Sequence, residues 1–207
     1  MKGKFIIFEG GEGSGKTVQI KTLARKLKKL GKKVIITREP GSTVIAEKIR
    51  QVILYENTEK LVPKAELFLF LASRAQHVQQ KILPALKKGY IVICDRFSAS
   101  TLAYQVGARN LPGENLIKKM DSYARSGLAP DMVIYLDVNP KIGIARKVRS
   151  LRKLTRIDKE KILFHEKVRK YFKKMIKQNK KWHLVDANKS LQENEKEIYE
   201  IINKKIR

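Results

Sequence analysis

Five short runs of apolar residues, rich in β-branched and aromatic side chains, recur along the chain. Each run is nearly continuous rather than alternating, which is typical of strands buried on both faces of a parallel sheet. Longer stretches that contain polar residues separate the runs. The pattern therefore predicts five strands, which lie at residues 4–9, 33–38, 90–95, 132–138 and 182–187.

The stretches between these runs carry apolar residues at helical spacing. After the first run, these residues are Ile20, Leu23, Leu27 and Leu30. Gly31 follows them as a typical C-terminal cap, and a second helical pattern occupies residues 159–178. Ser190 and Glu193 form a capping box that begins the last helix. Because strands and helices alternate, we expect one α/β domain over residues 1–207, with a parallel sheet between helical layers.

The charge of the chain narrows the range of partners. Lysine and arginine number 46 against 20 aspartate and glutamate residues, so the formal net charge is +26. Such an excess favours anionic partners, namely nucleic acids, membrane surfaces or phosphorylated small molecules. The lysines are nevertheless spread over most of the chain, which favours solvated helix faces over one dedicated binding stripe. Composition alone therefore leaves the partner open.

Other features exclude several kinds of site. Cys94 is the single cysteine, so we expect a buried thiol and neither an intramolecular disulfide nor a cysteine-based metal site. The three histidines are scattered and lack the spacing of metal ligands. The first apolar run is too short for a signal peptide, and no segment has transmembrane length. We therefore expect a cytoplasmic protein without a membrane partner.

A glycine-rich stretch, FEGGEGSGKT, joins the first predicted strand to the first predicted helix. Its residues match the pattern of a phosphate-binding loop, and the strand before it and the helix behind it are the context that this pattern requires. Glycines let backbone amides approach phosphate oxygens, and the helix N-terminus adds its dipole. The alternative, a flexible turn, is disfavoured by this placement. The expected ATP-binding residues are Gly10, Gly11, Glu12, Gly13, Ser14, Gly15, Lys16 and Thr17.

Two residues of this loop carry specific chemistry. Lys16 is expected on the solvent side of the loop, where it reaches the β- and γ-phosphates of a nucleoside triphosphate. The hydroxyl of Thr17 can bind Mg²⁺, the cofactor that such a loop requires. The loop itself does not identify the phosphoryl acceptor.

Further stretches point to the acceptor. Together with the loop, TREPGST, LFLFLASRAQHV and ILPALKKGYIVICDRFSASTLAYQ resemble the bacterial thymidylate kinases, a family of P-loop nucleoside monophosphate kinases, over nearly the entire chain. The resemblance implies transfer of the γ-phosphoryl group of ATP to dTMP, giving dTDP and ADP in the synthesis of dTTP. It also implies a three-layer fold with strand order 2-3-1-4-5, Mg²⁺ as cofactor and a homodimer.

The resemblance assigns a dTMP site. The family's counterpart of Phe70 stacks on the thymine ring, and that of Arg74 bonds its O4; the two residues lie four apart, on one side of a helix. A guanidinium only donates hydrogen bonds, so it suits a carbonyl and disfavours the amine of cytosine. Without the resemblance, a core phenylalanine beside a surface arginine is the better interpretation. Tyr104 is expected beneath the sugar, and Gln105 and Ser100 belong to the same site.

Two residues end the third predicted strand, at the sheet edge where ligands bind in open α/β folds. By resemblance, Arg96 contacts phosphate at the reaction centre. The resemblance also implies that Asp95 supports the magnesium shell. The structural alternative is an ion pair at the end of a strand.

Two further charged residues are assigned by resemblance. Glu12 corresponds to a carboxylate near the 3′-hydroxyl of the acceptor sugar. Arg38 corresponds to a residue on the acceptor side, and an ion pair with Glu39 or Glu47 is the alternative. Both assignments await the geometry of the folded chain.

A basic stretch over residues 146–158 corresponds to the family's lid. The phosphate loop holds no arginine, so we expect the cation that stabilises the transition state to come from this lid. Arg149 and Arg156 are the candidates, because both align with basic lid positions in relatives that lack a loop arginine. The remaining basic residues are expected to be solvated. The lid departs from the family at Thr155, where an aspartate is usual, while Val18 and Ser42 depart away from the chemistry.

Rival functions are weaker. A kinase for another nucleoside monophosphate is disfavoured by Phe70, Arg74 and Tyr104. A nucleic-acid-bound ATPase, prompted by the charge, would require a basic stripe with stacking aromatic residues along a groove, which the sequence lacks. Nucleic acid is therefore not expected as a partner. An inactive nucleotide-binding protein is disfavoured by the presence of Lys16 and Asp95.

Overall fold

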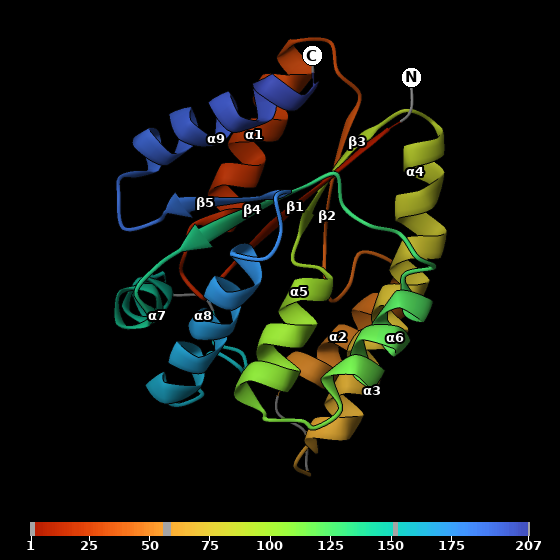
Figure 1. The fold of residues 1–207 in the computed structure, drawn as a ribbon, viewed down its shortest axis with the longest axis vertical. Coiled ribbons are helices and arrows are strands. Elements are labelled where there is room, and N and C mark those ends of the chain that lie inside the picture. The colour runs from red at the N-terminus through yellow and green to blue at the C-terminus, as the bar shows by residue number, and fades with distance from the viewer. Residues whose placement is uncertain (1–2, 56–58, 151–152, 207) are drawn as a thin grey trace.

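The computed structural model describes residues 3–55, 59–150 and 153–206. A sheet forms the centre of the molecule (Figure 1), and it consists of five strands. All neighbouring strands are parallel, in the order β2-β3-β1-β4-β5. The predicted α/β class and strand order are thereby confirmed. The strands are β1 (Lys4–Gly10), β2 (Val34–Arg38), β3 (Ile91–Asp95), β4 (Met132–Asp137) and β5 (Trp182–Asp186).

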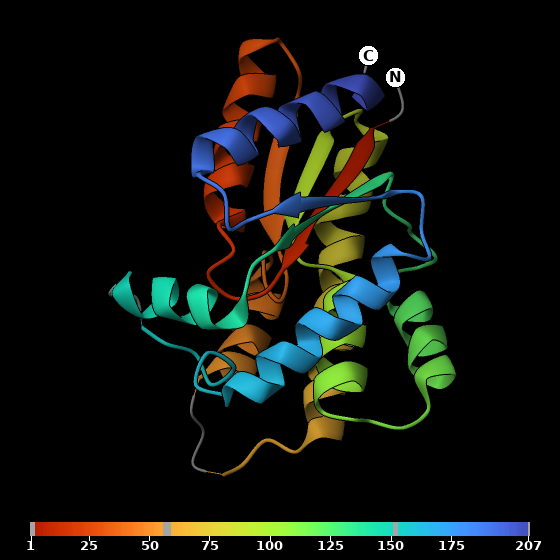
Figure 2. The same cartoon turned by 60° about the vertical axis from the view of Figure 1, so that its left-hand side comes forward.

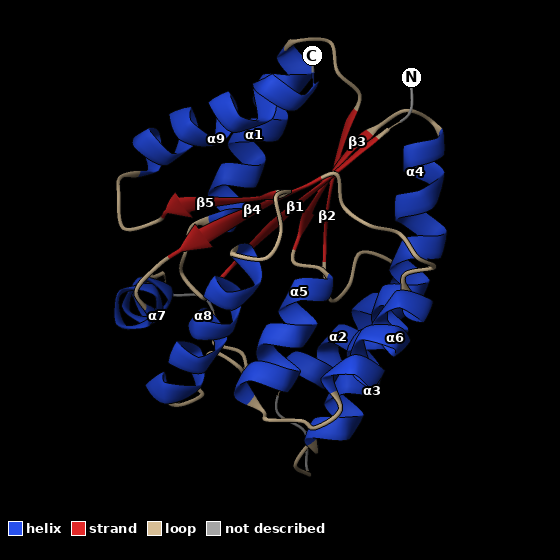
Figure 3. Cartoon of the chain, in the orientation of Figure 1, coloured by secondary structure: helices blue, strands red, loops and turns tan. Residues whose placement is uncertain are grey.

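Helices connect the strands and cover both faces of the sheet (Figures 1 and 3). On one face, α1 and α9 pack against each other, while α4 and α8 contact the opposite face; Figure 2 shows the same two layers from the side. Two helices contain π-helical segments, because α3 runs through η1 into α4 and α5 runs into η2. The helical elements are α1 (Lys16–Lys29), α2 (Val44–Leu54), α3 (Pro63–His77), η1 (Val78–Ile82), α4 (Leu83–Lys87), α5 (Ser98–Thr101), η2 (Leu102–Ala108), α6 (Glu114–Ala124), α7 (Pro140–Arg149), α8 (Ile162–Ile176) and α9 (Leu191–Ile206).

The central strand explains why the apolar runs are continuous. Ile6 and Phe8 belong to the core that β1 forms with α1 and α9, whereas Phe5 and Ile7 pack with η1 on the other face. Each of these four side chains is at most 1% exposed. Successive side chains of a strand point to opposite faces, so a strand covered on both sides needs an apolar residue at every position.

The prediction that all five strands are buried on both faces is wrong at the two edges. Ile36 of β2 is 43% exposed, and Leu184 of β5 is 46% exposed. Each of these strands pairs with a single neighbour, at the rim of the helical layers. The apolar composition of an edge strand therefore matches that of a central strand, and only the strand order separates them.

Several local predictions are confirmed. Gly31 has a φ of 73° directly after α1, as its role as a C-terminal cap requires. The Ser190 hydroxyl accepts the Glu193 backbone N–H at 3.2 Å, and the Glu193 carboxylate accepts the Ser190 N–H at 2.9 Å, which completes the capping box. Cys94 is buried in β3 with a free thiol. None of the described helices is long and apolar enough to cross a membrane.

The fold brings the carboxyl ends of three neighbouring strands to one edge of the sheet. The register pairs Phe8 of β1 with Asp95 of β3, and Asp95 with Arg38 of β2. The loop that follows β1 begins at the same edge and leads into α1. Ligands in open α/β sheets bind outside the carboxyl ends of the strands, so this edge is where a site is expected.

Candidate active site

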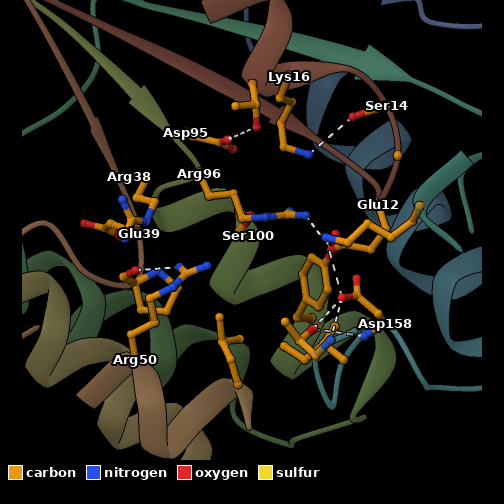
Figure 4. Close-up of a pocket in the computed structure, with 18 of the residues that line it drawn as sticks. Glu12, Ser14, Lys16, Arg38, Glu39, Arg50, Asp95, Arg96, Ser100 and Asp158 are labelled. Atoms are coloured by element: carbon orange, nitrogen blue, oxygen red, sulfur yellow. Dashed lines mark hydrogen bonds and ion pairs between the residues drawn. The ribbon is translucent and has the colours of Figure 1, made fainter. Parts of the chain in front are cut away.

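A cavity of about 820 Å³ opens at this edge of the sheet, and Figure 4 shows charged side chains that surround it. Its walls come from the loop after β1, the ends of β2 and β3, and from α1, α2, α3, α5, η2, α7 and the segment that follows α7. Four predicted site residues do not line it, namely Gly10, Gly11, Arg149 and Arg156. The predicted site residues that do line it are Glu12, Gly13, Ser14, Gly15, Lys16, Thr17, Arg38, Phe70, Arg74, Asp95, Arg96, Ser100, Tyr104 and Gln105.

The loop after β1 needs glycine at specific positions. Gly13 and Gly15 have φ values of 65° and 84°, in the left-handed region that favours glycine. A Cβ atom at Gly13 would lie 1.9 Å from the carbonyl oxygen of Gly143 in α7. The loop therefore touches the backbone of α7, and α1 begins at its other end without a side-chain cap on its N-terminal amides. This arrangement suits the binding of phosphate groups.

Lys16 lies inside the loop rather than on its solvent side, which corrects the prediction from the sequence. The residue is buried, and its Nζ donates to the carbonyl oxygens of Gly10 and Gly11 at 3.0 and 2.9 Å. The loop wraps around the ammonium group because its own carbonyls are acceptors within reach. Burial and the neighbouring Arg96 lower the pKa of Lys16 to about 8, although nearby carboxylates oppose the shift.

Two oxygen ligands suited to Mg²⁺ lie at the mouth of the loop. The Thr17 hydroxyl donates to the Asp95 carboxylate over 3.4 Å. The described residues include no group of three or more histidine, cysteine, aspartate or glutamate side chains that could hold a metal ion. Magnesium usually keeps several waters and takes few protein ligands together with phosphate oxygens, so a hydroxyl and one carboxylate fit this ion.

Arg96 and Glu12 face each other across the centre of the cavity (Figure 4). The guanidinium Nη2 lies 2.6 Å from the Glu12 Oε1, which also accepts the Tyr104 hydroxyl at 3.0 Å. Burial acts to raise the pKa of Glu12, but Arg96, Lys16 and other neighbours outweigh it and lower the pKa to about 2. The Glu12 side chain is therefore a carboxylate at neutral pH.

Glu9 contacts the turn that carries Arg96, and it was not predicted as a site residue from the sequence. Its carboxylate accepts the backbone N–H groups of Phe97 and Ser100 at 2.9 and 3.2 Å, and the Ser100 hydroxyl at 2.6 Å. Arg96 adopts a left-handed φ of 69° in the same turn, which is uncommon for an arginine. Burial raises the pKa of Glu9 to about 7. Glu9 thus holds the turn that aims Arg96 into the cavity.

Residues of α3 and η2 form another wall of the cavity. Phe70 and Arg74 both line it from α3, as their spacing predicted. Gln105 donates from Nε2 to the buried Glu66, while its Oε1 is buried without a hydrogen-bond partner among the described residues. A buried oxygen without a partner at a cavity wall is a free acceptor for a ligand donor.

The wall beside β2 carries the guanidinium groups of Arg38 and Arg50 together with the carboxylates of Glu39 and Glu47. Arg38 makes an ion pair with Glu47 at 2.8 Å, so the structural alternative that we considered is present, and Arg38 lines the cavity as well. Arg50, which sequence reasoning missed, lines the same wall and donates to the Pro40 carbonyl at 2.7 Å. The guanidinium N–H groups of Arg38 and Arg50 can donate to an anionic ligand group there.

The two predicted lid arginines do not reach the cavity in this structure. Arg149 is exposed at the end of α7. Arg156 donates to the Ile53 carbonyl and pairs with Glu66, which holds it against α2 and α3. Residues 151–152 of the predicted lid lie outside the described residues. The basic lid residues that line the cavity are instead Arg146 and Lys147.

The site residues that were not predicted differ in whether the sequence contains a signal for them. Glu9 is a charged residue within the first apolar run, in FIIFEG, and a carboxylate in a strand buried on both faces is a usable signal. Arg50 carries no such signal, because many basic residues occupy predicted helices in this chain. Glu66 is likewise indistinguishable from a surface glutamate until the fold buries it to 1% exposure.

Comparison with known proteins shows similarity to one family of enzymes. A family model described as thymidylate kinase matches residues 8–198. A thymidylate kinase of Pelotomaculum thermopropionicum is 44% identical over 191 residues, which cover 92% of this chain and 88% of the relative. Thymidylate kinases of Thermosipho africanus and Bacillus pumilus are 42% and 41% identical, and each alignment covers 98% of this chain and at least 96% of the relative.

The pKa of Lys16 predicts how ATP binding depends on pH. A bound polyphosphate stabilises the charged ammonium, so the affinity should be constant below about pH 8 and fall above it by up to about tenfold per pH unit. Calorimetric titration of the wild-type protein with ATP, at constant ionic strength from about pH 7 to 9.5, measures the change. Lys16→Arg is the control, because its guanidinium does not titrate there. Equal pH profiles for the two proteins would contradict the prediction.

Proposed function

Because this chain belongs to the thymidylate kinase family, its reaction is the transfer of the γ-phosphoryl group of ATP to dTMP, giving dTDP and ADP, and we propose that this transfer occurs in the cavity at the sheet edge. One observation carries the proposal: a single cavity is lined by the phosphate loop, by Arg96 and Glu12, and by Phe70 and Arg74. Donor and acceptor can therefore meet in one place, which phosphoryl transfer requires.

The phosphate loop, Gly10 to Thr17, binds the donor in this proposal. Its glycines keep the backbone amides free of side chains, and the N-terminus of α1 favours negative charge. Lys16 exchanges its contacts with loop carbonyls for contacts with the β- and γ-phosphates of ATP. Its charge then stabilises the phosphoryl group during transfer.

Mg²⁺ is the proposed cofactor, held by Thr17 directly and by Asp95 partly through water. The 3.4 Å separation of their oxygens supports this pairing. When bound, the ion neutralises charge on the phosphates of ATP.

The acceptor dTMP is proposed to lie between α3 and η2. Phe70 stacks on the thymine ring, and Arg74 donates to its O4. The free Oε1 of Gln105 can accept the N3–H of thymine, which cytosine does not have. The ring of Tyr104 packs beneath the sugar, and Arg38 contributes positive charge on the acceptor side.

The reaction centre in this proposal is the group formed by Arg96, Glu12 and Ser100. Arg96 binds phosphate oxygens at the point of transfer, and the neighbouring Ser100 hydroxyl, 3.2 Å from its Nη1, fixes that guanidinium. Because the Glu12 side chain is a carboxylate, it can accept a hydrogen bond from the 3′-hydroxyl of the acceptor sugar. It thereby orients dTMP toward the donor.

The whole chain acts as one kinase domain in this proposal, with residues 146–158 as its lid. Closure of the lid over bound nucleotide would exclude water and bring a cation to the phosphates. We keep Arg149 and Arg156 as the proposed cations, for which Arg156 has to leave Glu66. Arg146 already lines the cavity and is the competing candidate.

A homodimer is proposed on the side of the molecule formed by α2, α3 and α6. These helices are neighbours, since α3 contacts both α2 and α6. Large apolar side chains on them face solvent: Phe68 is 57% exposed, Leu116 is 61% exposed and Tyr123 is 90% exposed. Exposed apolar side chains on adjacent helices favour association with another protein surface.

The proposed function predicts a defined preference among acceptors. A coupled assay of ADP release should give the highest kcat/KM with dTMP among dTMP, dUMP, UMP, CMP and AMP. Lys16→Ala should lower turnover by several orders of magnitude, because it removes charge from the transferring group. Lys28→Ala, an exposed position on the same helix, is the matched control and should keep wild-type activity. Normal turnover by Lys16→Ala would exclude a catalytic loop.

The lid proposal predicts a loss of kcat without a comparable change in KM, because the lid cation stabilises mainly the transition state. Arg149→Ala or Arg156→Ala should lower kcat about a hundredfold with little change in KM. Arg109→Ala is the control, because Arg109 also pairs with Glu66 but lies outside the lid. If Arg156→Ala and Arg109→Ala lose activity equally, Arg156 acts through Glu66 alone. Loss in Arg146→Ala, with normal turnover in the two lid variants, would assign the cation to Arg146.

The dimer proposal predicts that a charge introduced into the interface lowers the molecular mass of the protein in solution. Light scattering of the wild-type protein should give the mass of two chains, and Phe68→Glu should give that of one, because a buried charge opposes association. Leu163→Glu is the matched control, since Leu163 is 59% exposed on α8. A monomeric wild-type protein, or equal effects of the two substitutions, would contradict the proposed interface.

A further inference from the structure

A cluster of buried charges lies behind the acceptor wall of the cavity. Glu39, Arg74, His77 and Asp121 are each at most 5% exposed, and of these only Glu39 and Arg74 line the cavity. Burying ion pairs has a desolvation cost that often equals their attraction, so such a cluster is weak evidence for a role in stability. Its geometry instead points to the arginine that it surrounds.

Arg74 is held from two sides. Its Nε donates to Glu39 Oε2 at 2.8 Å, and Nη2 lies 2.7 Å from the same oxygen. Its Nη1 donates to Asp121 Oδ1 at 2.5 Å and to Thr101 Oγ1 at 2.9 Å. A guanidinium has five N–H groups, so these contacts leave one on Nη2 without a partner among the described residues. Although burial opposes it, Glu39 and Asp121 raise the pKa of Arg74.

Glu39 is itself oriented by a second layer. Its other oxygen, Oε1, lies 3.1 Å from Nδ1 of His77, and Nε2 of His77 lies 2.5 Å from the Thr37 hydroxyl. A neutral imidazole satisfies both contacts when Nδ1–H donates to Glu39 and Nε2 accepts the hydroxyl proton. Both carboxylate oxygens of Glu39 are therefore engaged, and the group cannot turn away from Arg74.

Asp121 is supported in the same manner. It comes from α6, and its second oxygen, Oδ2, accepts Arg125 Nε at 3.1 Å. Arg125 also donates to the Leu128 carbonyl. Arg74 and Arg125 together balance the charges of Glu39 and Asp121, and Arg125 lies outside the buried cluster with its side chain 23% exposed. Each of the two carboxylates that hold Arg74 is thus paired with a guanidinium group.

A fixed arginine discriminates between ligands better than a mobile one. A flexible guanidinium could swing aside from a base that presents an amine in place of a carbonyl, and the wrong ligand would then lose little affinity. A guanidinium held at four of its N–H groups cannot do so, and its remaining N–H would meet the amine as donor against donor. Specificity of this kind depends on a repulsive contact that the wrong ligand cannot avoid.

We propose that Asp121 and His77, neither of which lines the cavity, are positioning residues that make Arg74 selective for acceptor bases with a carbonyl at position 4 over those with an amine. This inference rests on the proposed function, in which Arg74 donates to the base. Asp121 acts directly on Nη1, and His77 acts through Glu39 on Nε and Nη2. The class of acceptor selected is the 4-oxo pyrimidine nucleotides.

The test compares the binding of dTMP and dCMP to the full chain by calorimetric titration. Asp121→Asn keeps the size of the side chain and removes its charge, and should lower the dTMP to dCMP affinity ratio about tenfold or more. His77→Gln should lower the same ratio less, since it acts through Glu39. The affinity for ATP should change less than twofold in both. Asp131→Asn is the matched control, because Asp131 accepts the Phe5 N–H far from the cavity and should keep the wild-type ratio.

Arg74→Ala separates this inference from the proposed function. If Arg74→Ala leaves the dTMP to dCMP ratio unchanged, the base-reading role of Arg74 is wrong. If it lowers the ratio while a folded Asp121→Asn keeps it, the positioning role alone is wrong. Should Asp121→Asn fail to fold, Arg125→Gln decides on the same ratio, because it frees Asp121 and leaves the contacts of Arg74 itself intact. An equal fall in ATP and dTMP affinity would also overturn the inference, since it indicates general disruption.

Discussion

The ion pair between Arg96 and Glu12 joins the two halves of the site. Arg96 follows β3 and Glu12 belongs to the loop after β1, and these neighbouring strands bring Nη2 and Oε1 to 2.6 Å. Tyr104 donates to the same oxygen from η2, so three separate parts of the chain meet at one carboxylate. Glu9 holds the turn of Arg96 from within β1. This contact therefore links the loop after β1 to the turn after β3 and to η2.

The surroundings of Glu9 and Glu12 shift the pKa values of these two carboxyl groups in opposite directions. Burial raises the pKa of Glu9 to about 7, while neighbouring cations outweigh burial and hold that of Glu12 at about 2. The sign of each effect on stability follows from these shifts. Glu9 binds its proton more tightly when folded, so its contribution is lost as pH rises from 4.5 through about 7. Glu12 binds its proton less tightly when folded, so its contribution is lost as pH falls from 4.5 to about 2.

The confirmed predictions depend on residues that are close together in the sequence, whereas the features that were not predicted depend on how the chain folds in space. The strands, the capping box of α9 and the loop after β1 depend on residues within a few positions of one another, and they were predictable. The exposure of Ile36 and Leu184 depends on which strands lie at the edges, which no local pattern contains. The burial of Lys16 depends on how the loop closes around it, and the pairing of Arg156 with Glu66 depends on two segments 90 residues apart.

The sequence by itself determined the α/β class, the five strands and the phosphate loop, because periodicity and glycine placement express local backbone and burial requirements. With the family resemblance it also identified a set of site residues, most of which line the cavity. Only the tertiary structure decided which charges pair: Glu12 with Arg96, Glu39 and Asp121 with Arg74, and Glu66 with Arg156. Many arginines and few carboxylates leave numerous pairings open along the chain. Distance in the folded molecule selects among them, since the attraction between two charges weakens as their separation grows.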